Sequence, residues 1–341
     1  MKRASLSTRN QYSALISNIG LLLEQGRKQA YHAVNQILVK TYWDIGKQIV
    51  EYEQKGKEKA EYGSALLDKL SKDLKLKYGA GFNIRNIYLM RKFYLLFGKL
   101  QTLSAKLSWS HYVELISISD ELARNFYEQQ SINENWSVRE LKRQIDSALF
   151  HRVALSKDVR SVLDLSKKGQ IIEDPSDLIK EPFVLEFLNI PENRAYSEKD
   201  IEESIINNLQ AFLLELGKGF AFVGRQHRLS FGGRHYYIDL VFYHLILKCF
   251  VLIDLKIGEA DHLDVGQMNM YLNYFKHEEM SKEDNAPIGI ILAAKKNSFL
   301  VNYALGGLSN KLFVSKYQLY LPDKKELENK LSAALNNLPA A

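Results

Sequence analysis

The chain has 341 residues, of which 46% are hydrophobic, and its formal net charge is +6 at pH 7. This apolar share excludes a globally disordered chain, and no apolar run approaches the ~20 residues of a membrane-spanning helix. The single cysteine, Cys249, excludes an internal disulfide and a zinc site built from several cysteines. The N-terminus lacks the apolar core and cleavage site of a secretory signal, so we expect a cytoplasmic protein with no membrane partner.

The positive charge is concentrated in the first half of the chain. Residues 1–160 carry 26 Lys and Arg against 16 Asp and Glu, whereas residues 161–341 carry 20 against 24. A basic half of this kind fits a module that binds a polyanion such as nucleic acid. Solvated helix faces explain the same charges, and the charge count does not decide between the two interpretations.

Long helices are predicted for the first 155 residues. No proline precedes Pro175, so nothing interrupts helices in this part of the chain. Apolar residues recur at helical spacing. Asn83 is a good N-cap, and Ser137 with Glu140 forms a capping box. The expected helices cover residues 10–55, 62–77, 83–97 and 137–149, with two short helices over 109–130.

Two of these helices, joined by a short turn with Gly79 and Gly81, have the outline of a helix-turn-helix. Arg and Asn side chains near the start of a recognition helix suit guanine and adenine edges in the major groove. An ordinary αα-hairpin accounts for the same pattern, and both interpretations stay open. In the first, the residues that contact nucleic acid are Arg85, Asn86, Arg91 and Lys92.

Between residues 151 and 197 the helical pattern gives way to proline residues and turn-like sequences. Pro175, Pro182 and Pro191 separate turn-like sequences there. We therefore predict three parts: a helical N-terminal domain over 1–155, a linker or junction over 156–196, and a second domain over 197–341.

Helices and strands alternate in the second domain. Two strand-like segments flank a Gly-Gly turn at 232–233 and predict a β-hairpin. Residues 248–258 form a near-continuous apolar run, which is typical of a central strand buried on both faces. The order predicts an α/β sheet layered by helices. The expected elements are helix 198–217, strands 220–231, 234–244 and 248–258, helix 262–280, strands 287–294 and 312–321, and a terminal helix after Pro322.

Three charged residues interrupt the apolar strands. Asp239 lies in the hairpin, and Asp254 and Lys256 lie on the next strand. Residues two apart on a strand point to the same face, so Asp254 and Lys256 project together, and strand pairing brings Asp239 beside them. Two converging carboxylates suit Mg²⁺ or Mn²⁺, and an adjacent ammonium can position or deprotonate a water or stabilise charge on a phosphodiester. An Asp–Lys ion pair at the end of a sheet is the structural alternative.

The spacing of Asp239, Asp254 and Lys256 resembles the PD-(D/E)xK nuclease superfamily, and longer blocks resemble the YhcG family of bacterial PDDEXK nucleases. These blocks are GKGFAFVGRQHRLSFGGRHYYIDLVFYHLILKCFVLIDLKIGE, GQMNMYLNYF and PIGIILAAKK. Stretches such as YWDIGKQIV and NWSVRELKRQI resemble that family's N-terminal domain of unknown function. The resemblance covers about residues 30–335. It implies an α+β or α/β protein whose C-terminal domain has a restriction-endonuclease-like αβββαβ core that binds Mg²⁺ or Mn²⁺ through Asp239 and Asp254.

Further residues complete the expected site. Glu202 lies on the apolar face of helix 198–217, where some superfamily members place an acid, although the helix dipole also favours an acid there. Gln267 lies on the next helix, at a place that often borders the site, or else at a polar rim. Arg225 is expected to contact phosphate, with surface solvation as the alternative. Ile238 replaces a Pro that often precedes the first Asp, and this removes no ligand.

The leading hypothesis is a Mg²⁺-dependent nuclease that hydrolyses phosphodiester bonds of DNA, with an endonuclease favoured over an exonuclease. Its N-terminal domain would bind nucleic acid or select the target. The alternatives are a catalytically silent nucleic-acid-binding or scaffold protein that keeps the fold, and a nuclease directed at RNA. A homo-oligomer, with a dimer favoured, fits duplex cleavage because one active site cuts one strand.

Overall fold

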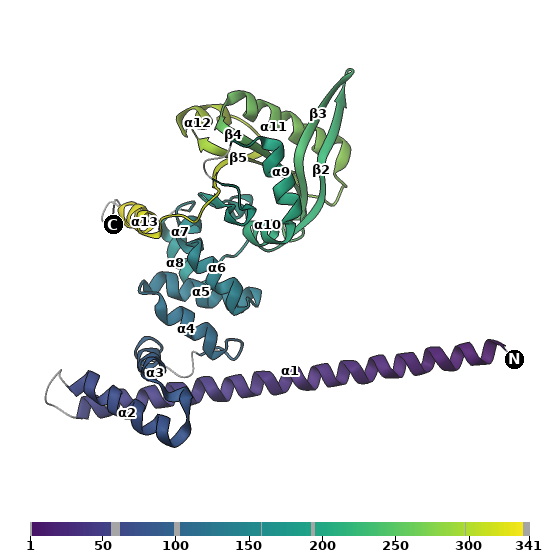
Figure 1. The fold of residues 1–341 in the computed structure, drawn as a ribbon. Coiled ribbons are helices and arrows are strands. Elements are labelled where there is room, and N and C mark those ends of the chain that lie inside the picture. Colours follow the sequence, from purple (N-terminus) through teal and green to yellow (C-terminus); the bar gives the residue numbers. More distant parts are fainter. Residues whose placement is uncertain are drawn as a thin grey trace. The chain divides into compact units, whose positions relative to one another are not determined.

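The computed structural model describes residues 2–55, 62–98, 103–157, 159–191, 195–296 and 298–336, and Figure 1 shows the elements along the chain. The chain divides into two compact units. Unit 1 comprises Met1–Arg124 and Ser131–Leu141, and unit 2 comprises Asn125–Gln130 and Lys142–Ala341. Within the described ranges, no helix is both long and apolar enough to cross a membrane.

Unit 1 is helical, as the sequence predicts. The apolar faces of its first three helices meet in a core that contains Ile49, Leu67, Ile87 and Met90. Gly46 lets two helices approach closely, because a Cβ at this position would collide with the backbone carbonyl of Met90. The elements are α1 (Lys2–Lys55), α2 (Tyr62–Tyr78), the 3-10 turn η1 (Ala80–Phe82), α3 (Ile84–Leu96), α4 (Trp109–Ser117) and part of α5 (Glu121–Glu134).

The segment 156–196, for which the sequence predicts a linker, belongs to unit 2. Leu178, Phe183, Leu185 and Leu188 are buried in the same core as the central strands. Boundaries of independently folding domains therefore stay a prediction. The elements that precede the main sheet in the chain are the end of α6 (Val138–Asp146), α7 (Leu149–Ala154), α8 (Val159–Lys168), η3 (Pro175–Leu178), β1 (Phe183–Val184) and η4 (Glu186–Leu188).

The described part of unit 2 contains a six-stranded sheet in the order β1-β6-β5-β4-β3-β2. Strand β3 pairs antiparallel with both β2 and β4. The pairs β4–β5, β5–β6 and β6–β1 are parallel. The order αβββαβ is thus confirmed. The elements are α9 (Glu198–Asn207), α10 (Leu209–Leu216), β2 (Phe220–Phe231), β3 (Arg234–His244), β4 (Cys249–Ala260), α11 (His262–Tyr274), the π-turn η5 (Phe275–Glu279), β5 (Ile288–Lys296), α12 (Ser298–Leu305), β6 (Lys311–Gln318) and α13 (Lys324–Asn336).

Helices cover both faces of this sheet (Figure 1). Side chains of α9 and α10, such as Ile205 and Phe212, share one core with Phe242 and Ile253 of the central strands. Side chains of α11 and α12 share a second core on the opposite face, which includes Val241 and Leu252. The strands that carry Asp239 and Asp254 are therefore held rigidly from both sides.

Strands β3 and β4 pair only as far as Leu240 and Ile253, whereas β2 and β3 continue together to Phe231 and Arg234. The β2–β3 hairpin therefore extends past the sheet, and Figure 1 shows it as a projecting two-stranded ribbon. At the base of this ribbon Gln226 has a positive φ of 48°, which is uncommon for a residue with a side chain.

Candidate active site

Asp239 and Asp254 lie where β3 and β4 diverge. The pairing of β3 with β4 ends at Leu240 and Ile253. Asp239 directly precedes Leu240 in the chain, and Asp254 directly follows Ile253. The Oδ2 atom of Asp239 accepts a hydrogen bond of 2.8 Å from the backbone N–H of Leu255 on β4. The divergence of the two strands leaves this backbone N–H unpaired by the ladder, so a side chain can bind it and fix its carboxylate beside Asp254.

Lys256 is held between two carboxylates. Its Nζ atom lies 3.0 Å from Oδ2 of Asp254 and 3.7 Å from Oδ1 of Asp264. Asp264 is fixed in turn by the capping box of α11, in which it accepts from the backbone N–H of Asp261. The ammonium therefore has a defined position next to the Asp pair, because strand β4 and helix α11 both hold it.

Glu202 joins the same group through a glutamine. Its side chain projects from α9, which begins at a capping box between Ser197 and Asp200, and Glu202 is only 5% exposed. The Nε2 atom of Gln226 lies 2.6 Å from Oε2 of Glu202 and 3.1 Å from Oδ1 of Asp239. One amide group thus connects a helix and a strand at the site.

No sequence signal singles out Gln226 from its neighbours in GRQHR. Its position depends on a positive φ, and the alternating pattern of a strand sequence does not indicate such a backbone angle. Backbone conformations of this kind often occur at functional sites.

Gln267 is connected to the strand that carries Asp239 through the hydroxyl of Tyr271. Its side-chain amide donates to the hydroxyl of Tyr271, and that hydroxyl donates to the carbonyl of Tyr237 on β3. Burial raises the pKa of Tyr271, and the charges of Asp254 and Lys256 also act on it. The structure therefore brings Asp239, Asp254, Lys256, Glu202 and Gln267 into one neighbourhood.

The electrostatics of the pair favour a bound cation. Burial raises the pKa of Asp239. Burial, followed by the charge of Asp239, raises the pKa of Asp254 to about 7 even though Lys256 acts in the opposite direction. For Lys256, burial opposes the charged form, but Asp254 outweighs it and raises the pKa above its usual value. A divalent cation would neutralise two buried carboxylates whose ionisation is opposed by burial and, for Asp254, also by the charge of its neighbour.

The donor set fits Mg²⁺ or Mn²⁺ in kind, because it consists of carboxylate oxygens. Within the described ranges, no group of three or more His, Cys, Asp and Glu side chains is arranged to hold a metal ion. The carboxylates of Asp239 and Asp254 are donors of this kind, and Mg²⁺ commonly takes its remaining ligands from water and substrate.

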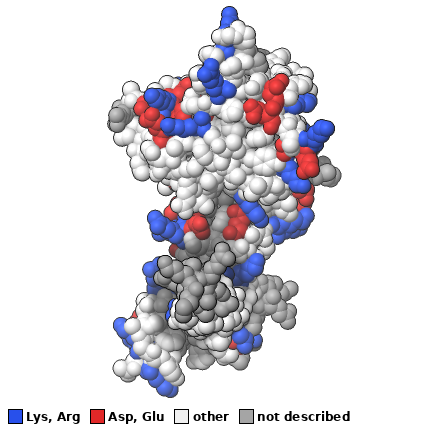
Figure 2. All heavy atoms as spheres, turned by 90° about the vertical axis from the view of Figure 1, so that its right-hand side faces the viewer, with Lys and Arg blue, Asp and Glu red and all other residues white. Residues whose placement is uncertain are grey.

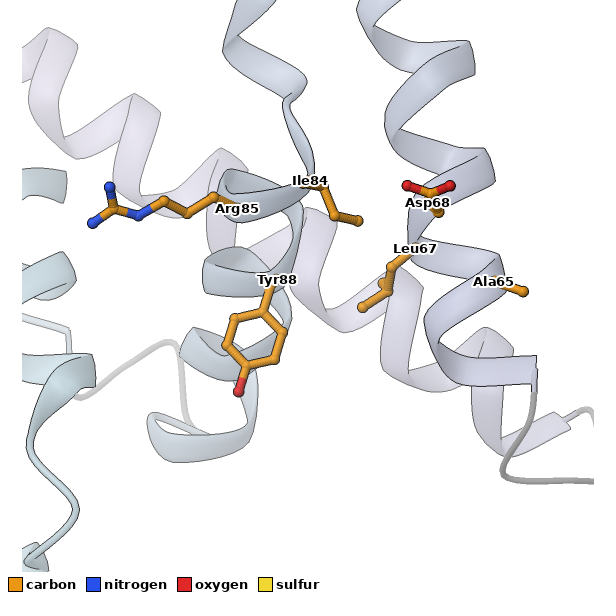
Figure 3. Close-up of a pocket in the computed structure, with 6 residues that line it drawn as sticks. All are labelled: Ala65, Leu67, Asp68, Ile84, Arg85 and Tyr88. Atoms are coloured by element: carbon orange, nitrogen blue, oxygen red, sulfur yellow. The ribbon is translucent and has the colours of Figure 1, made fainter.

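The residues expected to contact nucleic acid lie on two elements. Arg225 is exposed on β2, beside Gln226. Arg85 is exposed on α3 and points away from α2 in Figure 3, at the border of a shallow groove of about 580 Å³ between the two helices. Lys92 is half-exposed on α3.

Two further residues of this set make contacts inside unit 1. The Nδ2 atom of Asn86 donates to the carbonyl of Gly81 at 2.8 Å. The Nε atom of Arg91 donates to both oxygens of Glu53 on α1, at 3.0 and 2.8 Å. Of the four residues predicted on α3, Arg85 and Lys92 are thus the ones better placed for a ligand.

Comparison with known proteins agrees with this architecture. Residues 176–332 match the family model of the YhcG PDDEXK nuclease domain, and residues 18–152 match that of the DUF1016 N-terminal domain. The YhcG protein of Escherichia coli (strain K12) is 40% identical over 363 residues, which cover 97% of this chain and 96% of that protein.

Two solved structures are similar over part of the chain. A repair endonuclease from Pyrococcus abyssi has 23% sequence identity and a TM-score of 0.28, over 39% of this chain and 50% of that chain. A complex of EndoMS with double-stranded DNA has 18% identity and a TM-score of 0.26, with the same coverage. With scores this low, neither structure bears on the activity of this chain. The match along nearly the whole length of the E. coli protein decides the assignment: the chain belongs to the YhcG family, whose C-terminal domain is a PDDEXK nuclease domain.

Proposed function

We propose that this nuclease hydrolyses phosphodiester bonds of DNA in a reaction that depends on Mg²⁺ or Mn²⁺, and that it acts as an endonuclease. The observation that supports this most is the group of charged side chains at the divergence of β3 and β4. There Asp239 is fixed by the backbone of Leu255, and Lys256 lies 3.0 Å from Asp254. In a structural ion pair, the second carboxylate would have no purpose, and its proximity would only raise the cost of burial.

Each side chain has a role that follows from its contacts. Asp239 and Asp254 would hold the cation, which when bound supplies positive charge to the scissile phosphate. Lys256 would orient a water for attack on phosphorus and stabilise the negative charge that develops there. Glu202, through Gln226, would keep Asp239 in place, and Gln267 would fix the hydroxyl of Tyr271 at the border of the site.

Unit 1 would bind nucleic acid or select the target, with Arg85 and Lys92 of α3 as contacts and α2–η1–α3 as a helix-turn-helix. Its basic composition supports this part of the proposal. A dimer would place two active sites on the two strands of a duplex.

The test is cleavage of plasmid and linear DNA with Mg²⁺, Mn²⁺ or EDTA. The Lys256→Met and Asp254→Asn variants should lose at least about 100-fold in rate, because each removes a preorganised charge. The matched control is Asp164→Asn, which alters an exposed ion pair on α8 and should cleave like the parent. Full activity in the Asp254→Asn variant would disprove the site. Binding of DNA without cleavage in the presence of every metal would favour the catalytically silent scaffold protein. Preferential cleavage of RNA would make RNA the substrate in place of DNA.

A further inference from the structure

The segment that leads through the β2–β3 hairpin to Asp239 has an unusual composition for its half of the chain. Residues 217–238 contain one Lys, three Arg and two His and no Asp or Glu, although residues 161–341 together are acidic. Figure 2 shows Lys and Arg atoms at the tip of the projection at the top of that view. A concentration of positive charge in an acidic unit calls for a reason other than solubility.

One face of this ribbon packs against the protein. Leu229 and Ile238 are fully buried in the core that α11 and α12 share with the sheet. The ring of His227 contacts that of Phe275 at 5.2 Å, and its Nε2 atom lies 3.6 Å from Glu279. The ribbon is therefore anchored along one side to α11 and η5, and it is not a free loop.

The opposite face is exposed and polar. Arg228 pairs with Tyr237 and Ser230 pairs with His235 across the two strands, and all four residues are exposed. Arg228 lies 3.0–3.1 Å from the ring nitrogens of His235 through one guanidinium nitrogen. Directly opposed residues on antiparallel strands lie on the same face, so these side chains form one continuous surface. Arg234 pairs with Phe231 and so belongs by alternation to the other face, but it is exposed beside the turn at the tip.

The dimensions fit a groove of duplex DNA. From Arg234 to Asp239 the ribbon reaches about 17 Å, at about 3.4 Å per residue. The major groove is about 12 Å wide and about 8.5 Å deep, and it admits a two-stranded β-ribbon, whereas the minor groove is about half as wide. The base of the ribbon is Asp239 itself, so a duplex that offers a phosphate to the site passes the hairpin within about five base pairs.

We propose that the exposed face of the β2–β3 hairpin, formed by Arg228, Ser230, Tyr237 and His235 with Arg234 at the tip, enters the major groove of duplex DNA beside the cleaved bond. The inference rests on the proposed function for the class of ligand. It adds the element that grips the duplex, the groove that receives it and the distance from the cut.

Binding of a 30-base-pair duplex in EDTA tests the hairpin without requiring cleavage. The variant that combines Arg228→Gln and Arg234→Gln should bind about tenfold more weakly, and the slope of log affinity against log salt should become shallower by about 0.9 for each phosphate that the variant no longer neutralises. The control Lys311→Gln removes an exposed charge from β6 and should bind like the parent. Affinity for duplex RNA should not change, because its major groove is too narrow for side chains to read.

The outcomes separate the two proposals. Equal affinity of parent and double variant, or an equal reduction of affinity for duplex RNA, overturns the hairpin inference and leaves the nuclease assignment intact. If the parent binds no duplex DNA, the proposed DNA substrate fails as well.

A second measurement does not depend on affinity. Cys249 is the only cysteine and is buried, so the Ser230→Cys variant would carry a single accessible thiol. Saturating duplex DNA should slow its reaction with a maleimide at least about tenfold, but should not protect the thiol of the Ser176→Cys variant, which lies at an exposed position of η3. Equal reactivity of the hairpin thiol with and without DNA overturns the inference.

Discussion

Gln226 donates its side-chain amide to carboxylates on two different elements, Glu202 on α9 and Asp239 on β3. The Gln226→Ala variant should therefore lower kcat about 10- to 100-fold, as expected for a residue that positions Asp239, the proposed metal ligand. Binding of DNA in EDTA should not change, because the residue acts through Asp239. The measurement is a comparison of kcat, KM and Kd for the two proteins.

The Gln226→Gly variant separates the effect of losing the side-chain amide from the effect of the positive φ. Glycine suits the positive φ of this position, so the variant should be at least as stable as the parent while it loses activity like Gln226→Ala. An active Gln226→Gly protein would contradict the role of the amide.

The same residues show what sequence reasoning can reach at this scale. Asp239, Asp254 and Lys256 were predictable together, since strand periodicity and one short turn place charges from adjacent strands side by side. Gln226 was not, because its position depends on a backbone angle and on a helix 24 residues away in sequence. The contact of Asn86 with Gly81 was also hidden, since local turns can use polar side chains that a recognition-helix pattern assigns to a ligand.

At the scale of elements, two glycines of α1 give opposite predictions. A Cβ at Gly46 would collide with the carbonyl of Met90 on α3, whereas a Cβ at Gly20 meets nothing within 4 Å. The Gly46→Ala variant should therefore lose about 1–3 kcal/mol in the free energy of unfolding. The matched Gly20→Ala variant should gain up to about 1 kcal/mol from helix propensity.

Urea unfolding followed by tryptophan fluorescence measures this, because all three tryptophans, Trp43, Trp109 and Trp136, lie in unit 1. A Gly46→Ala protein as stable as the parent would show that α1 and α3 do not pack as described.

A buried ion pair fastens α7 to α10. Arg152 and Glu215 are both fully buried, with Nη1 and Oε1 2.5 Å apart, and Oε1 also accepts from the backbone N–H of Val184 on β1. The Glu215→Ala variant should lose about 3–5 kcal/mol, because it leaves the guanidinium buried without a counter-charge. The exposed pair of Lys168 and Asp164 on α8 provides the control, and Lys168→Ala should cost less than about 1 kcal/mol.

The same pair predicts a pH dependence. Burial alone would raise the pKa of Glu215, but Arg152, Lys180 and Arg143 outweigh it, so the pKa lies below 4.5, its usual value. A depressed pKa contributes stability that is present above pH 4.5 and is lost as pH falls through the lower value of the folded state. Urea unfolding followed by far-UV circular dichroism, at pH 7 and below about pH 4, should show the effect of Glu215→Ala shrinking in acid. An effect that grows in acid would contradict the assignment.

Most elements were predictable because their apolar periodicity is strong. The hairpin and the parallel strands β4 and β5 follow directly from alternation and from continuous apolar runs. Segment 156–196 was not, because apart from the ten-residue helix α8 it consists of a two-residue strand and two 3-10 turns, which are too short to show periodicity. Their apolar residues are buried by long-range contacts such as the pairing of β1 with β6, which a local pattern does not encode.

At the scale of the whole molecule, the limits of unit 2 lead to a prediction about fragments. The sequence places the start of the second domain at residue 197, but unit 2 also includes 125–130 and everything from Lys142 onward. The ring of Phe126 packs on that of Phe150 at 5.5 Å, and Tyr127 donates to the carbonyl of Gln144. These contacts attach residues 125–130 of α5 to the rest of unit 2.

A fragment of residues 121–341 should therefore unfold cooperatively and keep the proposed metal-dependent cleavage of DNA, with weaker binding because it lacks most of unit 1, the proposed nucleic-acid-binding part. A fragment of residues 197–341 should aggregate or unfold at much lower temperature. It loses β1, which leaves an edge of β6 unpaired, and it loses Arg152, which leaves Glu215 buried without its partner. Thermal unfolding by circular dichroism, with the full chain as control, distinguishes the two. Equal melting temperatures for both fragments would mean that residues 121–196 contribute nothing to the folded nuclease unit, and the boundary at 197 would then be correct.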